Sequence, residues 1–301
     1  MPPRLLLLAL CALSAACMTT SSVQRVRLDR LLVQLGVGSR TEVTRIIRQG
    51  RVSVSGAATK SPSVKVDWAA DDEAARPEIR VDDRALVAAP LLLAFHKPTG
   101  VHSVIGDPWG RPDLRTALPA PWSALLAAES LHPVGRLDAD TSGLLLFSSC
   151  GELTQRLLHP RSAVERQYVA GVAVGRSKED GAGGAALLAR DAEALSERLA
   201  RGVATTEGTF PARLVALEAT AEPTSRDDAT AVAAHASLVV TEGKHRMVRR
   251  LLANVGLPVV TLHRVRYGAV SLGELREGDA CAVTGESRSW ARALLPSARA
   301  R

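Results

Sequence analysis

The stretch that indicates the fold most clearly is residues 134–147, which read VGRLDADTSGLLLF. Asp138 follows an apolar side chain, and a Thr-Ser-Gly turn leads into the apolar run at 144–147. A short apolar run bounded by turn residues predicts a buried strand. A carboxylate at a loop mouth beside such a strand has the rigid support that a catalytic side chain needs. Asp138 and Asp140 are equally typical of turn residues that bond their own backbone, so both interpretations stay open at this point.

The composition favours a polyanionic partner. The 301 residues suffice for two compact domains, or for one large domain with appendages. The formal charge of +7 and the isoelectric point near 9.7 favour nucleic acid or an anionic membrane, and charge alone does not distinguish them. The four cysteines form no CxxC pair and the seven histidines lack metal-ligand spacing. We therefore expect a reduced compartment, no structural disulfide and no metal site.

Residues 1–22 predict a targeting leader. Arg4 precedes an apolar run at 5–13, small residues and a Ser/Thr cluster follow, and no acidic residue occurs before Asp29. The apolar run is too short to span a bilayer, which takes about 20 residues, so no stable membrane association is expected. An organelle is the expected destination, with a plastid favoured over a mitochondrion. The alternative is a wrongly assigned start codon in a protein of the bacterial cytoplasm.

Residues 25–66 predict a small helix-turn-helix-strand module. Leucines at 28, 31, 32 and 35 repeat with the spacing of one helix face. Ser39 and Glu42 have the spacing of a capping box, which opens a second helix. The alternating residues VSV at 52–54 then predict a short strand.

The polar faces of this module are strongly basic. Their acidic residues are only Asp29 and Glu42, and an acidic stretch begins at Asp67. Positive charge concentrated on a compact module favours phosphate binding over a merely solvated surface. The arginines expected to contact nucleic acid are Arg27, Arg30, Arg40, Arg45, Arg48 and Arg51.

The rest of the chain predicts a mixed α+β domain. The elements expected there are strands at 91–95 and 164–172, an ordered loop at 103–120, and helices at 152–159, at 185–201 and in a segment that stops at Gly256. Many short strands with few helices favour a mixed sheet over a Rossmann fold. No GxGxxG or GxxxxGK[ST] pattern occurs, which argues against a nucleotide cofactor.

Three segments of the N-terminal module carry a family resemblance. RLDRLL at 27–32, SR at 39–40 and IRQGRVSVSG at 47–56 resemble the RNA-binding module of the ribosomal-protein-S-four type. The resemblance covers about residues 25–70 and indicates RNA as the polyanion.

Further segments resemble the pseudouridine synthases of the RsuA and RluB type. These segments are KPTG at 97–100, HPVGRLDADTSGLLL at 132–146, ERQY at 165–168, EGKHRMVRR at 242–250 and RVRYG at 264–268. Their order matches that family, in which an RNA-binding module also precedes the catalytic domain. The resemblance implies an α+β protein with an S-four-like domain at 25–88 and, at 90–290, a catalytic domain built on a mixed, mainly antiparallel β-sheet.

The resemblance also implies a reaction and its residues. Enzymes of this family break the N1–C1′ bond of a uridine in RNA, turn the base and join C5 to C1′, without a cofactor. Asp138 matches the essential carboxylate, which acts either as nucleophile or as base. Tyr168 matches the ring beside the base, and Arg249 matches a basic residue that we expect to form an ion pair with Asp138. Asp140 is then left with the turn role.

Several basic residues of the catalytic domain are expected to contact RNA. Arg136 is expected to contact phosphate or to hold the loop in shape. The full set is Lys97, Arg136, Lys244, Arg246 and Arg250. The expected partner is ribosomal RNA or a pre-ribosomal particle, and the expected state is a monomer without metal.

Two other functions compete with this interpretation. A ribosome-assembly factor could keep the fold and bind RNA without catalysis, but binding alone requires none of Asp138, Tyr168 and Arg249. A hydrolase that used Asp138 would need a second catalytic carboxylate or a set of metal ligands, and neither accompanies Asp138 in the sequence. The phrases VERQY and RVRYG favour large-subunit over small-subunit ribosomal RNA as the substrate. Met247 departs from the family, which usually has Gln or Glu there.

Overall fold

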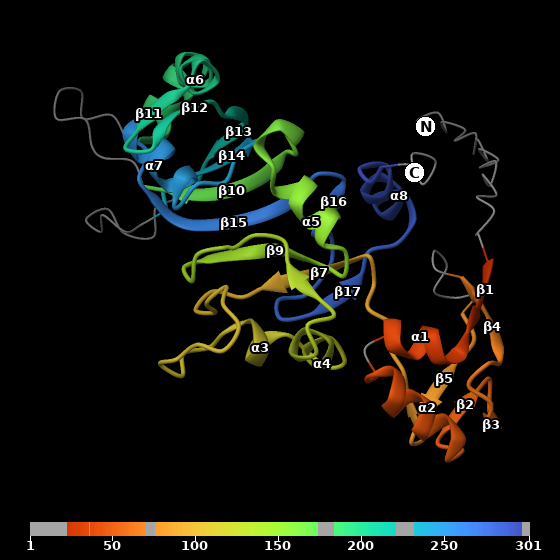
Figure 1. The fold of residues 1–301 in the computed structure, drawn as a ribbon. Helices are drawn as coiled ribbons and strands as arrows, with labels where there is room; N and C mark the ends of the chain where they lie inside the picture. Colours follow the sequence, from red (N-terminus) through yellow and green to blue (C-terminus); the bar gives the residue numbers. More distant parts are fainter. Residues whose placement is uncertain (1–22, 36, 70–75, 174–183, 221–231, 297–301) are drawn as a thin grey trace, which may run out of the picture. The chain divides into compact units, whose positions relative to one another are not determined.

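The computed structural model describes residues 23–35, 37–69, 76–173, 184–220 and 232–296 (Figure 1). The predicted leader at 1–22 lies outside these residues. The chain forms two compact units that divide between Leu86 and Val87, and each is described by itself. Within the described residues, no helix has the length and apolar character needed to cross a membrane.

The N-terminal unit packs two helices against short strands. Its elements are β1 (Val23–Arg27), α1 (Leu28–Gln34), α2 (Arg40–Arg48), β2 (Val52–Val54), β3 (Ala57–Thr59), β4 (Lys65–Ala69), β5 (Ile79–Val81) and β6 (Arg84–Ala85). Strand β1 pairs with β4, and the other four strands form a sheet in the order β3-β2-β5-β6. The predicted helices and the strand at 52–54 are confirmed. The strand β1 was not predicted, because its residues VQRVR are largely exposed and show no apolar pattern.

The capping box predicted from the sequence is present. The Ser39 hydroxyl accepts from the Glu42 backbone N–H at 3.3 Å, and the Glu42 carboxylate accepts from the Ser39 backbone N–H at 2.9 Å. These two bonds satisfy donors that the helix itself leaves free, which fixes the start of α2. Val43, Ile46 and Ile47 then face the core while the arginines between them face outward.

The C-terminal unit is built on one large sheet. Its strands are β7 (Leu92–Lys97), β8 (His132–Pro133), β9 (Thr141–Ser148), β10 (Arg166–Val172), β11 (Val203–Thr205), β12 (Gly208–Phe210), β13 (Arg213–Ala219), β14 (Ala234–Val240), β15 (Val259–Tyr267), β16 (Val270–Ser271) and β17 (Ala280–Ala282). Its helices are α3 (Leu114–Ala117), α4 (Trp122–Ala127), α5 (Gly151–Leu158), the 3-10 turn η1 (Pro160–Ser162), α6 (Gly184–Arg201), α7 (Met247–Asn254) and α8 (Gly285–Ala293).

Nine of these strands form the sheet, with β11 and β12 as a separate hairpin. The main order is β13-β14-β10-β15-β9-β7-β17, with β16 beside β15 and β8 beside β9. The pairing of β9 with β15 is parallel and the other pairings are antiparallel (Figure 1). The predicted class, a mixed and mainly antiparallel α+β sheet, is confirmed.

Strand β9 is buried on both faces, which explains its uninterrupted apolar run. Leu145 and Phe147 belong to one core, which also contains residues of α3, α4 and α7. Leu144 and Leu146 belong to a second core on the opposite face, where α5 packs. Because side chains alternate along a strand, only a central strand covered on both sides takes four consecutive large apolar residues.

Gly143 determines how closely β9 and β15 approach. Its φ is +104°, and a Cβ atom built there would lie 2.3 Å from the backbone oxygen of Arg264. Any other residue would therefore push the two strands apart. The Thr-Ser-Gly turn of the sequence is thus the start of the strand that supports the preceding acidic loop.

Some short elements were not predicted. Helices α3 and α4 lie within or directly after the region predicted as loop, and they span four and six residues. Such lengths are too short for a helical repeat to be visible in sequence. The predicted helices at 152–159, at 185–201 and before Gly256 correspond to α5, α6 and α7.

Candidate active site

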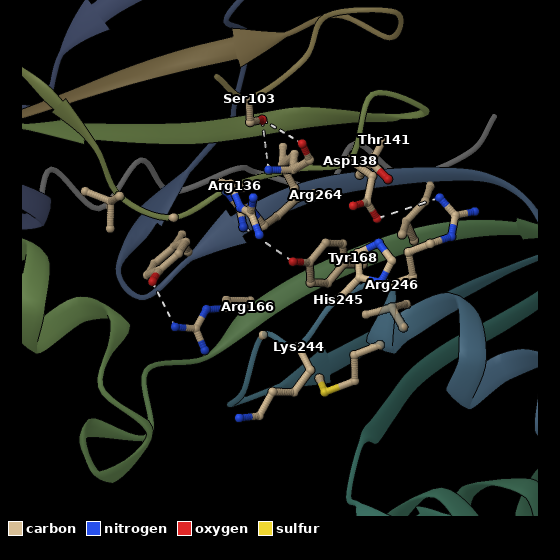
Figure 2. Close-up of a pocket in the computed structure, with 18 of the residues that line it drawn as sticks. Ser103, Arg136, Asp138, Thr141, Arg166, Tyr168, Lys244, His245, Arg246 and Arg264 are labelled. Carbon is tan, nitrogen blue, oxygen red and sulfur yellow. Dashed lines mark hydrogen bonds and ion pairs between the residues drawn. The ribbon is translucent and has the colours of Figure 1, made fainter. Parts of the chain in front are cut away.

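A cavity of about 430 Å³ lies beside the loop that precedes β9 (Figure 2). Asp138, Tyr168, Arg136, Lys244 and Arg246 all line it, so the structure brings together five of the residues predicted from sequence. Five segments contribute most of the lining: 102–104, the loop 134–139, strand β10, residues 242–248 and strand β15.

The backbone of this loop is held from several sides. The Ser103 hydroxyl donates to the Leu137 carbonyl at 2.6 Å and accepts from the Leu137 N–H at 3.1 Å. The Gly100 N–H donates to the Ala139 carbonyl at 2.7 Å, and the Thr141 N–H donates to the Asp138 carbonyl at 3.1 Å. The backbone on both sides of Asp138 is therefore fixed before any substrate arrives, as a catalytic carboxylate requires.

Asp138 faces a basic wall of the cavity. Its carboxylate lies 4.0 Å from the Arg246 guanidinium, and both side chains are partly exposed (Figure 2). The other guanidinium nitrogen of Arg246 lies 3.0 Å from the Asp140 carboxylate. Arg246 has a left-handed backbone, with φ of 50°, directly before helix α7. Its side chain thus faces both acidic residues of the loop.

The predicted ion pair between Arg249 and Asp138 is wrong. Arg249 Nη2 donates to the backbone carbonyl of Asp140 at 2.8 Å and lies 3.3 Å from the Asp140 carboxylate. Its Nη1 donates to the Val259 carbonyl at 3.3 Å. The Arg249 side chain is buried and is not among the residues that line the cavity. Two carboxylates two positions apart in a turn cannot be assigned to a partner by spacing alone.

Asp140 consequently does more than shape its own turn. Burial opposes its ionisation, but the hydrogen bond from Arg246 and the charge of Arg249 hold the pKa of Asp140 below its ordinary value. Burial in turn lowers the pKa of the Arg249 guanidinium, which remains a cation because such groups titrate far above neutral pH. Asp140 and Arg249 therefore connect the loop to helix α7 and strand β15.

Tyr168 stands at one end of a buried series of alternating rings and guanidinium groups. The chain contains only two tyrosines, Tyr168 and Tyr267, and both belong to this series. Arg166 lies 4.8 Å from the Tyr267 ring centre, and Arg264 lies 5.1 Å from Tyr267 and 5.9 Å from Tyr168. Cation–π contacts of this kind are stronger where water is excluded, so the series fixes the Tyr168 ring at the cavity wall.

Arg264 places a positive charge at the cavity without a carboxylate beside it among the described residues. Its Nε donates to the Leu144 carbonyl at 2.7 Å and its Nη1 donates to the Tyr168 hydroxyl at 3.4 Å (Figure 2). Its Nη2 is buried and has no hydrogen-bond partner within the described parts of the chain. Arg166, Arg264 and Tyr267 all lie in the motifs ERQY and RVRYG, but the sequence alone indicates no role for them, because their contacts join strands far apart in sequence.

Lys97 does not contact solvent, so its predicted contact with RNA is wrong. The side chain is 0% exposed, and its Nζ donates to the Pro98 carbonyl at 2.8 Å. Burial lowers the pKa of Lys97 to about 8, against the opposing attraction of Asp138 and Asp140. Position 97 is the last residue of strand β7, where its side chain lies on the same face as Phe95.

The RNA contact of Arg250 stays a prediction, because its side chain is partly exposed but already has a partner. Arg250 forms an ion pair with Glu207 at 2.7 Å and is not among the residues that line the cavity. It therefore joins helix α7 to the hairpin of β11 and β12. Consecutive arginines on a helix point in different directions, so Arg249 and Arg250 take different partners.

The N-terminal unit has its own basic surface along α2. Three of the predicted arginines line a shallow groove there, together with Thr41, Thr44 and Gln49. We call this surface the α2 groove, and its basic residues are Arg40, Arg45 and Arg48. Within the described chain none of these three has an ion pair. Arg30 is exposed, whereas Arg27 and Arg51 pair with Asp29 and Asp82.

No group of three or more His, Cys, Asp and Glu residues suited to a metal occurs among the described residues. The site thus consists of a rigidly held carboxylate, an aromatic ring and several cations around one cavity. This combination suits an enzyme that acts on an anionic substrate containing a flat ring.

Comparison with known families identifies the class. The family described as RNA pseudouridylate synthase matches residues 91–254, and the S4 domain family matches residues 26–73. The first match covers more than half of the chain, so this chain belongs to the RNA pseudouridylate synthase family. The family assignment made from the sequence motifs is confirmed.

Similar proteins carry more specific names. The ribosomal large subunit pseudouridine synthase B of Yersinia pestis is 34% identical over 253 residues, which cover 82% of this chain and 68% of that protein. The protein of the same name from Xanthomonas campestris pv. campestris is 33% identical and is covered over only 49% of its length. A crystal structure of a pseudouridylate synthase matches with 25% identity and a TM-score of 0.49, covering 90% of this chain and all of that one.

Proposed function

We propose that this protein converts a uridine of ribosomal RNA to pseudouridine, with Asp138 as the essential carboxylate. The observation that carries the proposal is the cavity in which Asp138 and Tyr168 meet a wall of arginines. The relatives named for the large ribosomal subunit favour large-subunit RNA as the substrate.

The proposed reaction is an isomerisation and needs no net oxidant, reductant or water. The N1–C1′ bond breaks, C5 bonds to C1′, C5 loses a proton and N1 gains one, so the product is an isomer of the substrate. Asp138 acts either by attacking the nucleoside or by moving a proton, and both roles need a carboxylate held at a fixed place.

The cavity supplies what the flipped nucleotide needs. Extracting a base from its stack costs a few kcal/mol, and contact with an aromatic face contributes about 1–3 kcal/mol per base. Tyr168 lines the cavity and provides that ring, which the Arg264 guanidinium also contacts. Arg136 is exposed and lines the cavity, so its charge can contact a phosphate next to the flipped nucleotide.

The N-terminal unit contributes affinity in this proposal. The α2 groove offers three arginines that form no ion pair with any described residue, which suits phosphates along an RNA backbone. Such contacts carry little sequence information, so the choice of uridine belongs to the C-terminal unit.

The decisive experiment compares Asp138→Asn with the unaltered chain on protein-free ribosomal RNA. Chemical mapping of the RNA measures pseudouridine formation, which we expect to fall below detection in Asp138→Asn. The dissociation constant for RNA should stay within about twofold of that of the unaltered chain. Asp279→Asn is a matched control, because Asp279 is exposed, lies in the same unit and is not among the cavity residues. Equal activity of Asp138→Asn would refute the assignment. An unaltered chain that binds RNA without forming pseudouridine would favour the non-catalytic assembly factor.

A further inference from the structure

Trp109 is unusually exposed for its size. It is 76% exposed, the highest fraction among the large apolar side chains of the described residues. Ile105 and Val104 on the same loop are also exposed, at 46% and 39%. Aromatic residues make up only 3% of the chain, so a tryptophan left in water at the tip of a loop needs an explanation. Exposed apolar groups clustered in one place mark interaction sites.

The loop that carries Trp109 is rigidly built. The Asp107 carboxylate accepts from the backbone N–H groups of Trp109 and Arg111 at 3.1 and 3.0 Å. It also forms an ion pair with the Arg111 guanidinium at 2.7 Å, and these bonds lower the pKa of Asp107 to about 2. Asp113 closes the loop by accepting from the Gly106 and Asp107 N–H groups. Because the loop is already ordered, binding of a ligand to Trp109 costs little conformational entropy of the loop.

A cation accompanies the exposed ring. The Arg111 guanidinium lies 4.7 Å from the centre of the Trp109 ring. Its bonds to Asp107 keep it in this place while its side chain remains partly exposed. A flat apolar surface with a fixed cation beside it matches a nucleotide, which combines a flat base with a phosphate.

The loop is continuous with the candidate active site. His102, Ser103 and Val104, at the start of the loop, line the cavity, and Ser103 holds the residue before Asp138. Trp109 is five positions after Val104, so its backbone lies at most about 18 Å from that of Val104. A strand whose uridine occupies the cavity therefore passes within a few nucleotides of Trp109.

We propose that Trp109 stacks on an unpaired RNA base that neighbours the target uridine. Flipping one nucleotide out of a strand leaves its neighbours without a stacking partner. Trp109 supplies a replacement surface, and Arg111 lies where it can meet the adjoining phosphate. The proposal rests on the proposed function, which supplies RNA as the substrate and a uridine in the cavity. A protein of the pre-ribosomal particle is the alternative occupant, and the fixed cation and the continuity with the cavity favour RNA.

The first test measures RNA binding without turnover. We expect Trp109→Ala to raise the dissociation constant for protein-free large-subunit ribosomal RNA by about 5- to 150-fold, the equivalent of about 1–3 kcal/mol per stacked base. Trp109→Phe keeps a stacking ring, so most of the affinity should remain. Val215→Ala is the matched control, because Val215 is an exposed apolar residue on the remote edge strand β13 and should change nothing.

The base itself provides a second test. Once the modified uridine is mapped, abasic nucleotides are placed one at a time on either side of it in a short RNA. At the contacted position, the affinities of Trp109→Ala and the unaltered chain should become equal. Unchanged affinity of Trp109→Ala for protein-free RNA would overturn the proposal, and a loss seen only with intact pre-ribosomal particles would assign Trp109 to a protein partner. The comparison of Trp109→Ala and Trp109→Phe with the unaltered chain reads binding without turnover, so an inactive chain would refute the proposed function and leave that comparison interpretable.

Discussion

Asp140→Asn separates the support of the acidic loop from its chemistry. In the structure the Asp140 carboxylate forms ion pairs with the guanidinium groups of Arg249 and Arg246, with N–O distances of 3.3 and 3.0 Å. Asparagine keeps the size and the backbone carbonyl that Arg249 also contacts, but removes the charge. The buried Arg249 then loses its only carboxylate among the described residues. We expect lower stability and a loop that holds Asp138 less firmly.

The size of the effect follows from distance and exposure. Two unit charges 3.3 Å apart interact with about 1 kcal/mol in water and about 5 kcal/mol at an effective dielectric constant of 20. The Asp140 side chain is 48% exposed, which places the value near the lower limit. We expect a loss of about 1–2 kcal/mol, most of it from Arg249. For a unit of about 150–250 residues this lowers Tm by about 2–8 °C.

Asp138→Asn is the matched comparison. Its carboxylate has one ion pair, at 4.0 Å to the partly exposed Arg246, which contributes at most about 1 kcal/mol. We therefore expect Asp138→Asn to abolish pseudouridine formation with Tm nearly unchanged. Asp140→Asn should lower Tm and reduce the rate by about 10- to 100-fold without abolishing it, as misplacement of a catalytic group does.

Calorimetric melting and single-turnover assays on ribosomal RNA measure the two effects. The reasoning is refuted if Asp140→Asn melts at the unaltered temperature, or if Asp138→Asn is the variant with the lower Tm. Complete loss of activity in Asp140→Asn, with turnover retained in Asp138→Asn, would exchange the roles of the two residues.

Three further predictions concern other parts of the chain. Gly143→Ala should lose at least about 2 kcal/mol of unfolding free energy in denaturant titrations, because its Cβ would overlap the β15 backbone and its φ is left-handed; Gly278→Ala, also left-handed but with open space around its Cβ, should lose less. Because the folded pKa of Lys97 is about 8 and its unfolded value 10.5, the unfolded chain binds more protons between these values, so stability should rise with pH by about 3 kcal/mol across that window. Lys97→Met should remove this rise. If the stability of Lys97→Met depended on pH in the same way as that of the unaltered chain, the rise would not come from Lys97. Changing the three arginines of the α2 groove to glutamine should weaken RNA binding and reduce its salt slope by about 2–3, whereas an unchanged slope would place the RNA elsewhere.

Local patterns were sufficient for helices α1, α2, α5, α6 and α7 and for the central strand, whereas α3, α4 and α8 were not predicted. The capping box before α2 involves residues three apart, so the same bond that fixes the helix is visible in sequence. The apolar run of β9 requires burial on both faces, which follows from the alternation of side chains along a strand. Elements of two to six residues, such as β1, α3 and α4, have too few positions to show a period.

The family motifs also placed Asp138 and Tyr168 at one cavity. What they could not determine was the partner of each charge. Arg249 turns to Asp140 because helix α7 packs where it meets the end of the loop, and Lys97 is buried because β7 lies inside the sheet. Both outcomes depend on how distant segments pack, and a motif contains no such information.

The sequence by itself determined the two units, the family and the central acidic loop, because these depend on periodicity, turn chemistry and motifs that are local to the chain. The tertiary structure alone decided which carboxylate Arg249 supports, that Lys97 is buried, and that Tyr267 lies between Arg166 and Arg264 with Tyr168 beyond Arg264. These contacts join residues up to about a hundred positions apart, and only the packed sheet brings them within a few ångströms of each other.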